Sequence, residues 1–370
     1  MRKYSSMMYG VAAALPFLVL SAGCYILMDV PRLMQLWQPA FDSDRIEWDN
    51  SNGGGSIPLL RAFYHVGFLD WYWRGLTVTF APATLGVDPI GWWTGFQFLT
   101  QLAPLYATWM LDASRNRSGP KRFTTLFMFL GQVFGTGVIV PVFHLFEFIC
   151  GDTPADLVAS PTRTRRDIQS LLCYRTTPPF LPLLLLLHLL PVAGAFCAPQ
   201  LQIRHICVWF WFLVPVWIGL GNKLLTRLSI LGSKNTPSSP VEPTRRAAVV
   251  AQRHLIILTG LSAGVWIYML ASAPYSLHTI LVPKASDLAH SHQLLLRSRL
   301  IWQADFLCTF GSTAVFIAYQ HAGHHRAGLL HRNDWLLPAF LPAVTAVGGP
   351  GTAVAAAWLW KETIMLRTVL

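Results

Sequence analysis

The sequence predicts an all-α fold: a polytopic transmembrane helical bundle of about eight or nine spans, forming a single transmembrane domain over residues 1–370. Composition is the first reason, because 53% of the residues are hydrophobic and only 12% are charged, whereas an average soluble domain carries about 25% charged residues. The mean hydropathy of +0.44 agrees with this. Such a chain cannot cover a soluble surface with polar groups, so lipid must be its solvent.

The apolar residues are also gathered into runs of about 17 to 25 residues, enough to cross a hydrocarbon core of about 30 Å. The first run follows Arg2 and Lys3, and we expect it to be a retained signal anchor. The clear runs lie at residues 9–27, 92–111, 123–149, 179–198, 206–222, 254–273, 300–319 and 336–359. Segment 66–87 is ambiguous, because its charged residues and proline fit a ninth span, a re-entrant piece or an interfacial helix equally well.

Three connections are predicted to be flexible loops, near residues 28–61, 150–178 and 232–246. The first contains a Ser-Asn-Gly-Gly-Gly-Ser linker, and the third has three prolines among serines and threonines; both compositions are typical of mobile links. The basic loops 223–253 and 320–335 fall on one side of the predicted bundle. We expect that side to be cytosolic.

The net charge of +11 lies mostly in short connections between apolar runs. Basic residues there contact anionic lipid head groups and signal topology. No nucleic-acid-binding module is visible, so membrane lipid rather than nucleic acid is the expected partner. The protein is expected to be integral to a membrane, that of the endoplasmic reticulum; the oligomeric state is not predicted.

Charged residues inside apolar runs are candidates for chemistry, because each costs several kcal/mol in a membrane. Asp305 is the sharpest case, since no basic residue lies on its inward side. A carboxyl in such surroundings stays protonated near neutral pH, as a Brønsted acid must. The alternative is a helix-packing hydrogen bond to a neighbouring span.

Helical spacing groups the other candidates. Glu147 and His144 are three residues apart and share a helix face, as do Asp112 and Arg115. Asp70 stands four residues before an arginine and can pair with it. The simpler interpretations are an interfacial carboxylate for Glu147 and ion pairs at helix ends for the others.

The string His321-Ala-Gly-His324-His325 matches one histidine box of membrane di-iron oxidases. Those enzymes need two further boxes, which the remaining histidines do not supply at the required spacing. Surface histidines are the simpler interpretation, and no metal site is predicted. The sequence also lacks DDxxD, NSE, DxDD and NDxxD motifs, a P-loop and GxSxG, which argues against ionisation of a diphosphate.

Several motifs resemble a known family. An acidic-x-x-Arg helix end is matched by Asp112 and Arg115, and a late Gln-x-Asp is matched by Asp305 and the glutamine before it. A Gln-x-x-Gly-x-Gly-x-x-x-Pro span is matched by Gln132, Gly135, Gly137 and Pro141. The chain thus resembles the fungal integral-membrane terpene cyclases of meroterpenoid pathways, of the type found in ascochlorin, ascofuranone and macrophorin biosynthesis. It departs from them at Asp112, where the family usually has Glu.

The resemblance implies a terpene cyclase of isomerase or lyase type in secondary-metabolite biosynthesis. Such an enzyme protonates the terminal alkene or epoxide of a farnesylated substrate and guides cation cyclisation, with no metal and no cofactor. The expected catalytic residues are Asp305, Glu147 and Asp112, with Arg115 orienting Asp112. The expected substrate-binding residues are Asp70, His144, Trp109, Trp302 and Gln132.

Two other functions remain open on the residues alone. A proton-coupled small-molecule transporter would use Asp305 or Glu147 as its coupling site, but the sequence shows no inverted repeat. A di-iron lipid oxidase would use the His321 box and would require further histidine clusters beside it.

Overall fold

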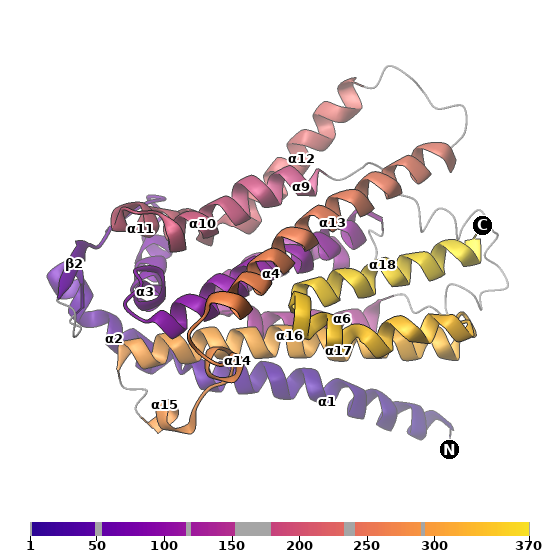
Figure 1. Ribbon diagram of the computed structural model, residues 1–370, viewed down its shortest axis with the longest axis horizontal. Coiled ribbons are helices and arrows are strands. Elements are labelled where there is room, and N and C mark those ends of the chain that lie inside the picture. Colours follow the sequence, from indigo (N-terminus) through magenta and orange to yellow (C-terminus); the bar gives the residue numbers. More distant parts are fainter. Residues whose placement is uncertain are drawn as a thin grey trace.

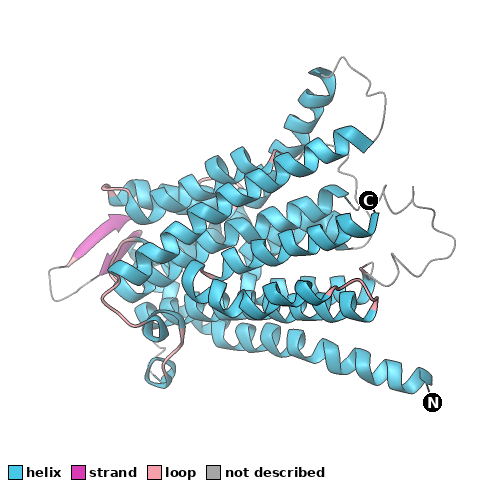
Figure 2. Ribbon diagram, turned by 45° about the vertical axis from the view of Figure 1, so that its right-hand side comes forward, coloured by secondary structure: helices cyan, strands magenta, loops and turns pink. Residues whose placement is uncertain are grey.

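The computed structural model describes residues 2–48, 54–115, 120–151, 179–232, 241–289 and 293–369. Over these ranges the chain is mostly helical, which confirms the all-α fold class. The sheet in the described part is an antiparallel hairpin of β1 (Arg45–Trp48) and β2 (Gly55–Pro58), which lies at one end of the bundle (Figure 2). The described chain is therefore a helical bundle, and a functional site is expected between its helices.

The longer helices run side by side along one direction, and several shorter ones are turned away from it (Figure 1). In the first half they are α1 (Arg2–Met28), α2 (Val30–Ser43), α3 (Gly67–Thr84), α4 (Pro89–Arg115), η1 (Pro120–Phe123), α5 (Thr124–Phe134) and α6 (Thr136–Cys150). In the second half they are α9 (Phe180–Leu183), η2 (Leu184–Leu189), α10 (Leu190–Cys197), α11 (Leu201–Phe212), α12 (Val214–Gly232), α13 (Val241–Ser272), α14 (Leu277–Leu281), α15 (Ala285–Ala289), α16 (Leu294–Arg326), η3 (Arg332–Trp335), α17 (Leu336–Gly348) and α18 (Pro350–Val369).

Helices α4 and α16 form the centre of the bundle. α16 packs on α1, α4 and α6, and α4 also packs on α13 and α18. Their contact is aromatic: the ring of Phe98 meets Trp302, Phe306 and Phe310 edge-on, at centroid distances of 6.2, 6.0 and 6.3 Å. Edge-to-face pairs at such distances add to the hydrophobic gain from burial.

Four helical stretches of the described chain are long and apolar enough to cross a membrane, or five if the bent pair α11 and α12 forms one span. The four are Ala12–Ser43, Phe180–Cys197, Ala248–Ser272 and Leu294–Arg326. Several apolar helices could therefore span a membrane, which supports membrane association. The predicted number of eight or nine spans is not supported.

Two physical causes account for the smaller number. The predicted run 123–149 is two short helices of 11 and 15 residues, α5 and α6, broken at Gly135. The run 336–359 is likewise broken at Gly349, between α17 and α18. A run of apolar residues does not reveal such a break, because a glycine with positive φ hardly changes hydropathy.

The second cause is the polar content of α4. Its glutamines bind carbonyls of a neighbouring helix: Gln97 Nε2 donates to Val265 O at 2.6 Å, and Gln101 Nε2 to Ser262 O at 3.0 Å. Helix α4 is thus enclosed by protein, since its polar side chains are satisfied by other helices.

The predicted flexible segment 28–61 contains α2 and the hairpin, with residues 49–53 outside the described part. Trp37 holds α2 to α3, because its ring covers Gly75 and its Nε1 donates to Thr79 Oγ1 at 2.8 Å. A Cβ at Gly75 would collide with this ring. Of the other two segments predicted to be flexible, residues 152–178 and 233–240 lie outside the described residues.

Candidate functional site

Four charged side chains converge at the end of the bundle that carries both chain termini (Figure 1). We call them the acid–lysine cluster: Asp112 of α4, Lys121 of η1, Glu147 of α6 and Lys361 of α18. Lys121 Nζ lies 3.3 Å from Asp112 Oδ2 and 3.4 Å from Glu147 Oε2. Lys361 Nζ lies 3.2 and 3.1 Å from the two oxygens of Asp112. Among the described residues of the cluster, two lysines thus face two carboxylates.

Asp112 and Glu147 differ in their surroundings. Asp112 also accepts a hydrogen bond of 2.9 Å from Trp358 Nε1, and 17% of its side chain is exposed. Glu147 is 3% exposed and has Lys121 as its cation. Burial disfavours the charged form of Lys121, but the two carboxylates outweigh this and raise its pKa above the ordinary value. Lys121 therefore remains a cation that ties α4 to α6.

A small recess of about 50 Å³ adjoins the cluster, between α4, α6, α16 and α18. His144 lies in its wall, stacked on Phe316 with ring centroids 4.5 Å apart and edge-on to Trp109 at 5.9 Å. His144 Nε2 lies 3.1 Å from Thr313 Oγ1. The recess therefore combines aromatic faces with titratable groups, on helices that are distant in sequence.

Two polar atoms of α6 are unpaired at this place. His144 Nδ1 and Glu147 Oε1 are buried and have no hydrogen-bond partner among the described residues. Buried polar atoms in native proteins are nearly always paired, so an unpaired one calls for an explanation such as a ligand or an ordered water. His144 Nδ1 lies in the recess wall and Glu147 Oε1 in the adjoining acid–lysine cluster, so together they mark this region as receptive to a polar group.

The structure thus brings together four of the predicted site residues: Asp112, Glu147, His144 and Trp109. Their roles remain predictions. Arg115 is the last residue of α4, but its side chain lies outside the described residues.

Asp305 lies elsewhere, at the break between α5 and α6. Its Oδ1 accepts hydrogen bonds from the backbone N–H of Gly137 at 2.8 Å and from Cys24 Sγ at 3.7 Å. It thereby satisfies a free N–H in the first turn of α6, as a capping residue does. This is the packing alternative weighed from the sequence, and a catalytic role for Asp305 remains a prediction.

Three other predicted residues are also apart from the cluster. Trp302 packs on Phe80 at 4.5 Å in the aromatic core, and Gln132 is buried near the end of α5. Asp70 lies in the first turn of α3 and accepts hydrogen bonds from the backbone N–H groups of Phe63, Tyr64 and Val66 at 3.0, 2.9 and 2.9 Å. In the described structure Asp70 thus holds a turn.

Sequence reasoning missed Lys121, Lys361 and Trp358 as site residues. Lys121 stands in a basic connection between apolar runs, where the sequence predicts contact with lipid head groups. Lys361 and Trp358 share a face of α18 but are separated from Asp112 by more than two hundred positions. Their i, i+3 spacing at the end of an apolar run was the one available signal.

The described residues contain no group of three or more His, Cys, Asp or Glu side chains arranged to hold a metal ion. His321 instead packs against Trp335 and Trp360, at 4.5 and 5.1 Å. The structure therefore lends no support to a di-iron oxidase, as far as the chain is described.

Comparison with known proteins places the chain. The CtvD domain family matches residues 14–366. The chain is 23% identical over 322 residues to the FAD-dependent monooxygenase verC1 of Penicillium polonicum, and 24% identical over 313 residues to the FAD-dependent monooxygenase anuJ of Penicillium roqueforti. Each match covers 84% of this chain but only 37% and 36% of the relatives, so the chain spans little more than a third of their length. No solved structure matches.

These relatives correct the functional prediction. A terpene cyclase of isomerase or lyase type is wrong, and so is the transporter alternative, because both relatives are named monooxygenases, which are oxidoreductases. Both relatives are fungal proteins, which agrees with the predicted context of fungal secondary metabolism.

The relatives' names raise the question of whether this chain could hold FAD. Dinucleotides bind where a parallel strand enters a helix through a glycine-rich turn, whereas the sheet in the described residues is an antiparallel hairpin. The Gly135-Thr-Gly137 segment joins two helices, and a Cβ on Gly137 would lie 2.7 Å from Cys24 Sγ and 2.9 Å from Asp305 Oδ1. The residues there are too closely packed to admit a pyrophosphate, so neither this glycine pair nor the hairpin fits FAD.

Proposed function

Because this chain belongs to the CtvD domain family, we propose that it is the membrane-embedded, substrate-holding part of an oxidising system in fungal secondary metabolism. It binds an apolar small molecule with its polar end at the acid–lysine cluster. A FAD-dependent monooxygenase carries out the oxidation. Support for the oxidation comes from the relatives' names, and support for the separation of roles comes from the poor fit of FAD to the glycine pair and to the hairpin.

The observation that carries the proposal is the convergence at the recess. Helices α4, α6, α16 and α18 line the recess with aromatic rings, Asp112, His144 and Lys361, and Lys121 of η1 links Asp112 to Glu147 beside it. His144 Nδ1 in the recess wall and Glu147 Oε1 in the adjoining cluster are left unpaired. A recess of about 50 Å³ is far smaller than a pocket for a whole ligand, which measures about 300–1,000 Å³. It therefore takes the carbonyl or hydroxyl end of the substrate, while the hydrocarbon part stays among the helices and lipid.

The substrate class that we propose is a prenylated small molecule, such as a farnesylated phenol. Its chain is at home in a bilayer, and its oxygen atoms can accept from a lysine or donate to a carboxylate. An endoplasmic reticulum membrane is the proposed location, since it would present such a substrate to a soluble or tethered flavoprotein.

The test is equilibrium binding of a radiolabelled farnesylated phenol to the purified chain in lipid nanodiscs. Saturable binding is expected, and Glu147→Gln should weaken it by about tenfold, since a hydrogen bond to a charged group contributes about 1.5–3 kcal/mol and tenfold is about 1.4 kcal/mol. Lys223→Gln is the matched control, because Lys223 is an exposed residue of α12.

Unchanged affinity in both Glu147→Gln and His144→Phe would contradict the proposed site. FAD added to the same nanodiscs should remain unbound. Tight binding of FAD to this chain would overturn the division of roles while leaving the substrate site untouched.

A further inference from the structure

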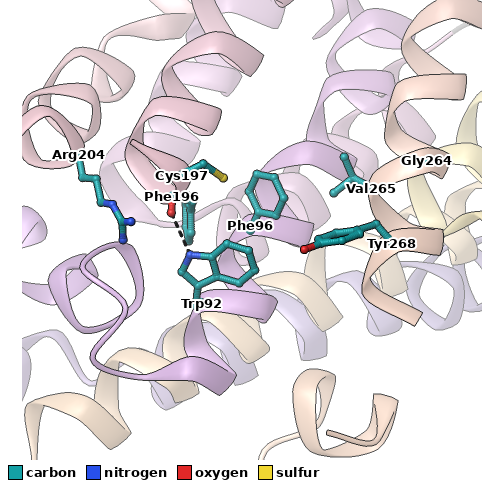
Figure 3. Close-up of a pocket in the computed structure, with 8 residues that line it drawn as sticks. All are labelled: Trp92, Phe96, Phe196, Cys197, Arg204, Gly264, Val265 and Tyr268. Atoms are coloured by element: carbon teal, nitrogen blue, oxygen red, sulfur yellow. Dashed lines mark hydrogen bonds between the residues drawn. The ribbon is translucent and has the colours of Figure 1, made fainter. Parts of the chain in front are cut away.

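A second cavity lies on the flank of the bundle and is unrelated to the acid–lysine cluster. It is an open groove of about 610 Å³ between α4, α10, α11 and α13. Figure 3 shows its lining residues, with Arg204 at one end and Tyr268 at the other. Its volume is in the range of small-molecule sites.

The walls of this groove are aromatic. The ring of Phe96 lies 5.2 Å from that of Trp92 and 5.6 Å from that of Phe196, and Trp92 Nε1 donates to Phe196 O at 3.0 Å (Figure 3). Tyr268 leaves 53% of its surface exposed. This hydrogen bond fixes one wall, so the groove is a shaped feature that a hydrocarbon chain can occupy.

A glycine keeps the groove open. A Cβ added at Gly264 of α13 would have no atom within 4 Å, so this face of the helix is uncovered by the rest of the chain. The groove adjoins Phe180–Cys197 and Ala248–Ser272, two of the candidate membrane spans. It therefore opens where acyl chains lie.

Arg204 supplies a charge at the groove's end. Its Nε donates to Ala198 O at 2.6 Å and its Nη1 donates to Thr84 O at 3.1 Å, which holds the guanidinium in place. No carboxylate pairs with it in the part of the chain that the structure describes. A fixed guanidinium beside apolar walls is well suited to a phosphate, because its remaining N–H groups can bind phosphate oxygens.

The position of Arg204 at the end of a candidate membrane span also agrees with a phosphate ligand. The candidate span Phe180–Cys197 ends just before the carbonyl of Ala198 that Arg204 binds. The end of a span lies near the lipid head groups. The charge of Arg204, its position at the end of a candidate span and the uncovered apolar slot beside Gly264 thus favour a ligand that has a phosphate and an apolar chain.

We propose that this groove is a phospholipid-binding site, in which the lipid phosphate binds Arg204 and an acyl chain lies along Trp92, Phe196 and Tyr268. The site is separate from the proposed substrate recess. A bound lipid would close the groove between α10 and α13, which is open in the protein alone.

The test uses a phosphatidic acid with a photoreactive diazirine in one acyl chain, added to the full chain in nanodiscs. Crosslinks are expected on the peptides that contain Trp92 and Tyr268. Gly264→Leu should reduce them at least fivefold, because the leucine side chain would occupy the slot from a position where its Cβ meets no atom within 4 Å. Gly23→Leu on α1 is the matched control, since a Cβ there also meets nothing within 4 Å.

Arg204→Gln, which removes the guanidinium, and competition with unlabelled lipids test whether the phosphate contributes to binding. Unlabelled phosphatidic acid should displace the probe, and diacylglycerol with the same chains should not. Equal displacement by diacylglycerol would overturn the role of the phosphate, and labelling that is unchanged in Gly264→Leu would overturn the site. Either result would leave binding of a farnesylated phenol unaffected.

Discussion

At the scale of single residues, the carboxylates of this bundle have distinct duties. Asp305 caps the first turn of α6, Asp70 closes a turn before α3, and Asp112 with Glu147 faces two lysines. Asp112 lines a recess whose wall includes the unpaired Nδ1 of His144, and Glu147 lies beside it with an unpaired Oε1. The role of each carboxylate could not be predicted from its position in or beside an apolar run. Each role depends on hydrogen-bond donors from another part of the chain.

The hydrogen bonds to Asp70 predict how the free energy of unfolding depends on pH. Burial alone would raise its pKa, but the N–H donors of Tyr64, Phe63 and Val66 outweigh burial and lower it. The stabilisation is thus fully present above the unfolded-state pKa of about 3.9 and is lost as pH falls through the lower folded-state value. Asp70→Asn should reduce the free energy of unfolding at pH 7 by about 1–3 kcal/mol.

The difference between Asp70→Asn and wild type should shrink towards pH 3, as measured by chemical unfolding in detergent micelles. Asp42→Asn is the control, because Asp42 is exposed on α2. A deficit of the Asp70 variant that is equal at both pH values would contradict the charge-dependent role.

At the scale of elements, the break between α5 and α6 organises the centre. Gly135 has φ +90, a conformation that L side chains rarely adopt, and a Cβ there would collide with Met28. The neighbouring Gly137 allows α6 to approach Cys24 of α1 and Asp305 of α16. Three helices meet at this point because two residues lack side chains.

Gly135→Ala should therefore destabilise the protein, by about 1–3 kcal/mol for backbone strain together with overpacking. Thermal unfolding in the same detergent measures it. Gly23→Ala serves for comparison, since it adds the same methyl group to α1 in open space. Equal unfolding temperatures for the two variants would show that the break is not constrained as described.

The same break explains why the predicted function failed although the predicted fold class was right. The Gln-x-x-Gly-x-Gly pattern and the late aspartate gave the resemblance to terpene cyclases, yet Gly135, Gly137 and Asp305 meet one another in helix packing. Residues with a packing role report on fold more than on activity. Apolar runs predicted most helices, whereas breaks at single glycines carried no hydropathy signal.

The candidate site was partly predictable. The i, i+3 spacing placed His144 and Glu147 on one helix face, and the structure brings Asp112 and Trp109 beside them. The lysine partner Lys361 was not predictable, because it reaches Asp112 only through the packing of α18 on α4. Sequence spacing gives neighbours within a helix but not between helices.

At the scale of the whole molecule, charge is distributed unevenly between the two ends. Both termini lie at one end (Figure 1), which the C-terminal parts of α16 and α18 also reach with Arg326, Lys361 and Arg367. At the other end Asp44 pairs with Arg61 and Arg74, Asp88 and Asp287 pair with Arg299, and Asp29 pairs with Arg297, so acidic and basic side chains are equal in number in these pairs. The positive-inside rule therefore predicts that the end with the termini faces the cytosol.

This orientation predicts the state of an acceptor sequence for N-glycosylation. Asn116-Arg117-Ser118 follows α4 directly in the sequence, and α4 ends on the terminal side. The asparagine should remain unmodified in microsomes, and a C-terminal epitope tag should be cleaved by protease without detergent. A glycan that is removed by endoglycosidase, or a protected tag, would show the opposite orientation.

The substrate site itself is tested most directly by photoaffinity labelling with a farnesylated phenol that carries a benzophenone on its ring. We predict labelled peptides from α4, α16 and α18 that contain Trp109, Phe316 and Trp358, with labelling diminished in Glu147→Gln and retained in Lys223→Gln. Labelling confined to the flank groove at Trp92 and Tyr268, or absent altogether, would contradict a substrate site at the acid–lysine cluster.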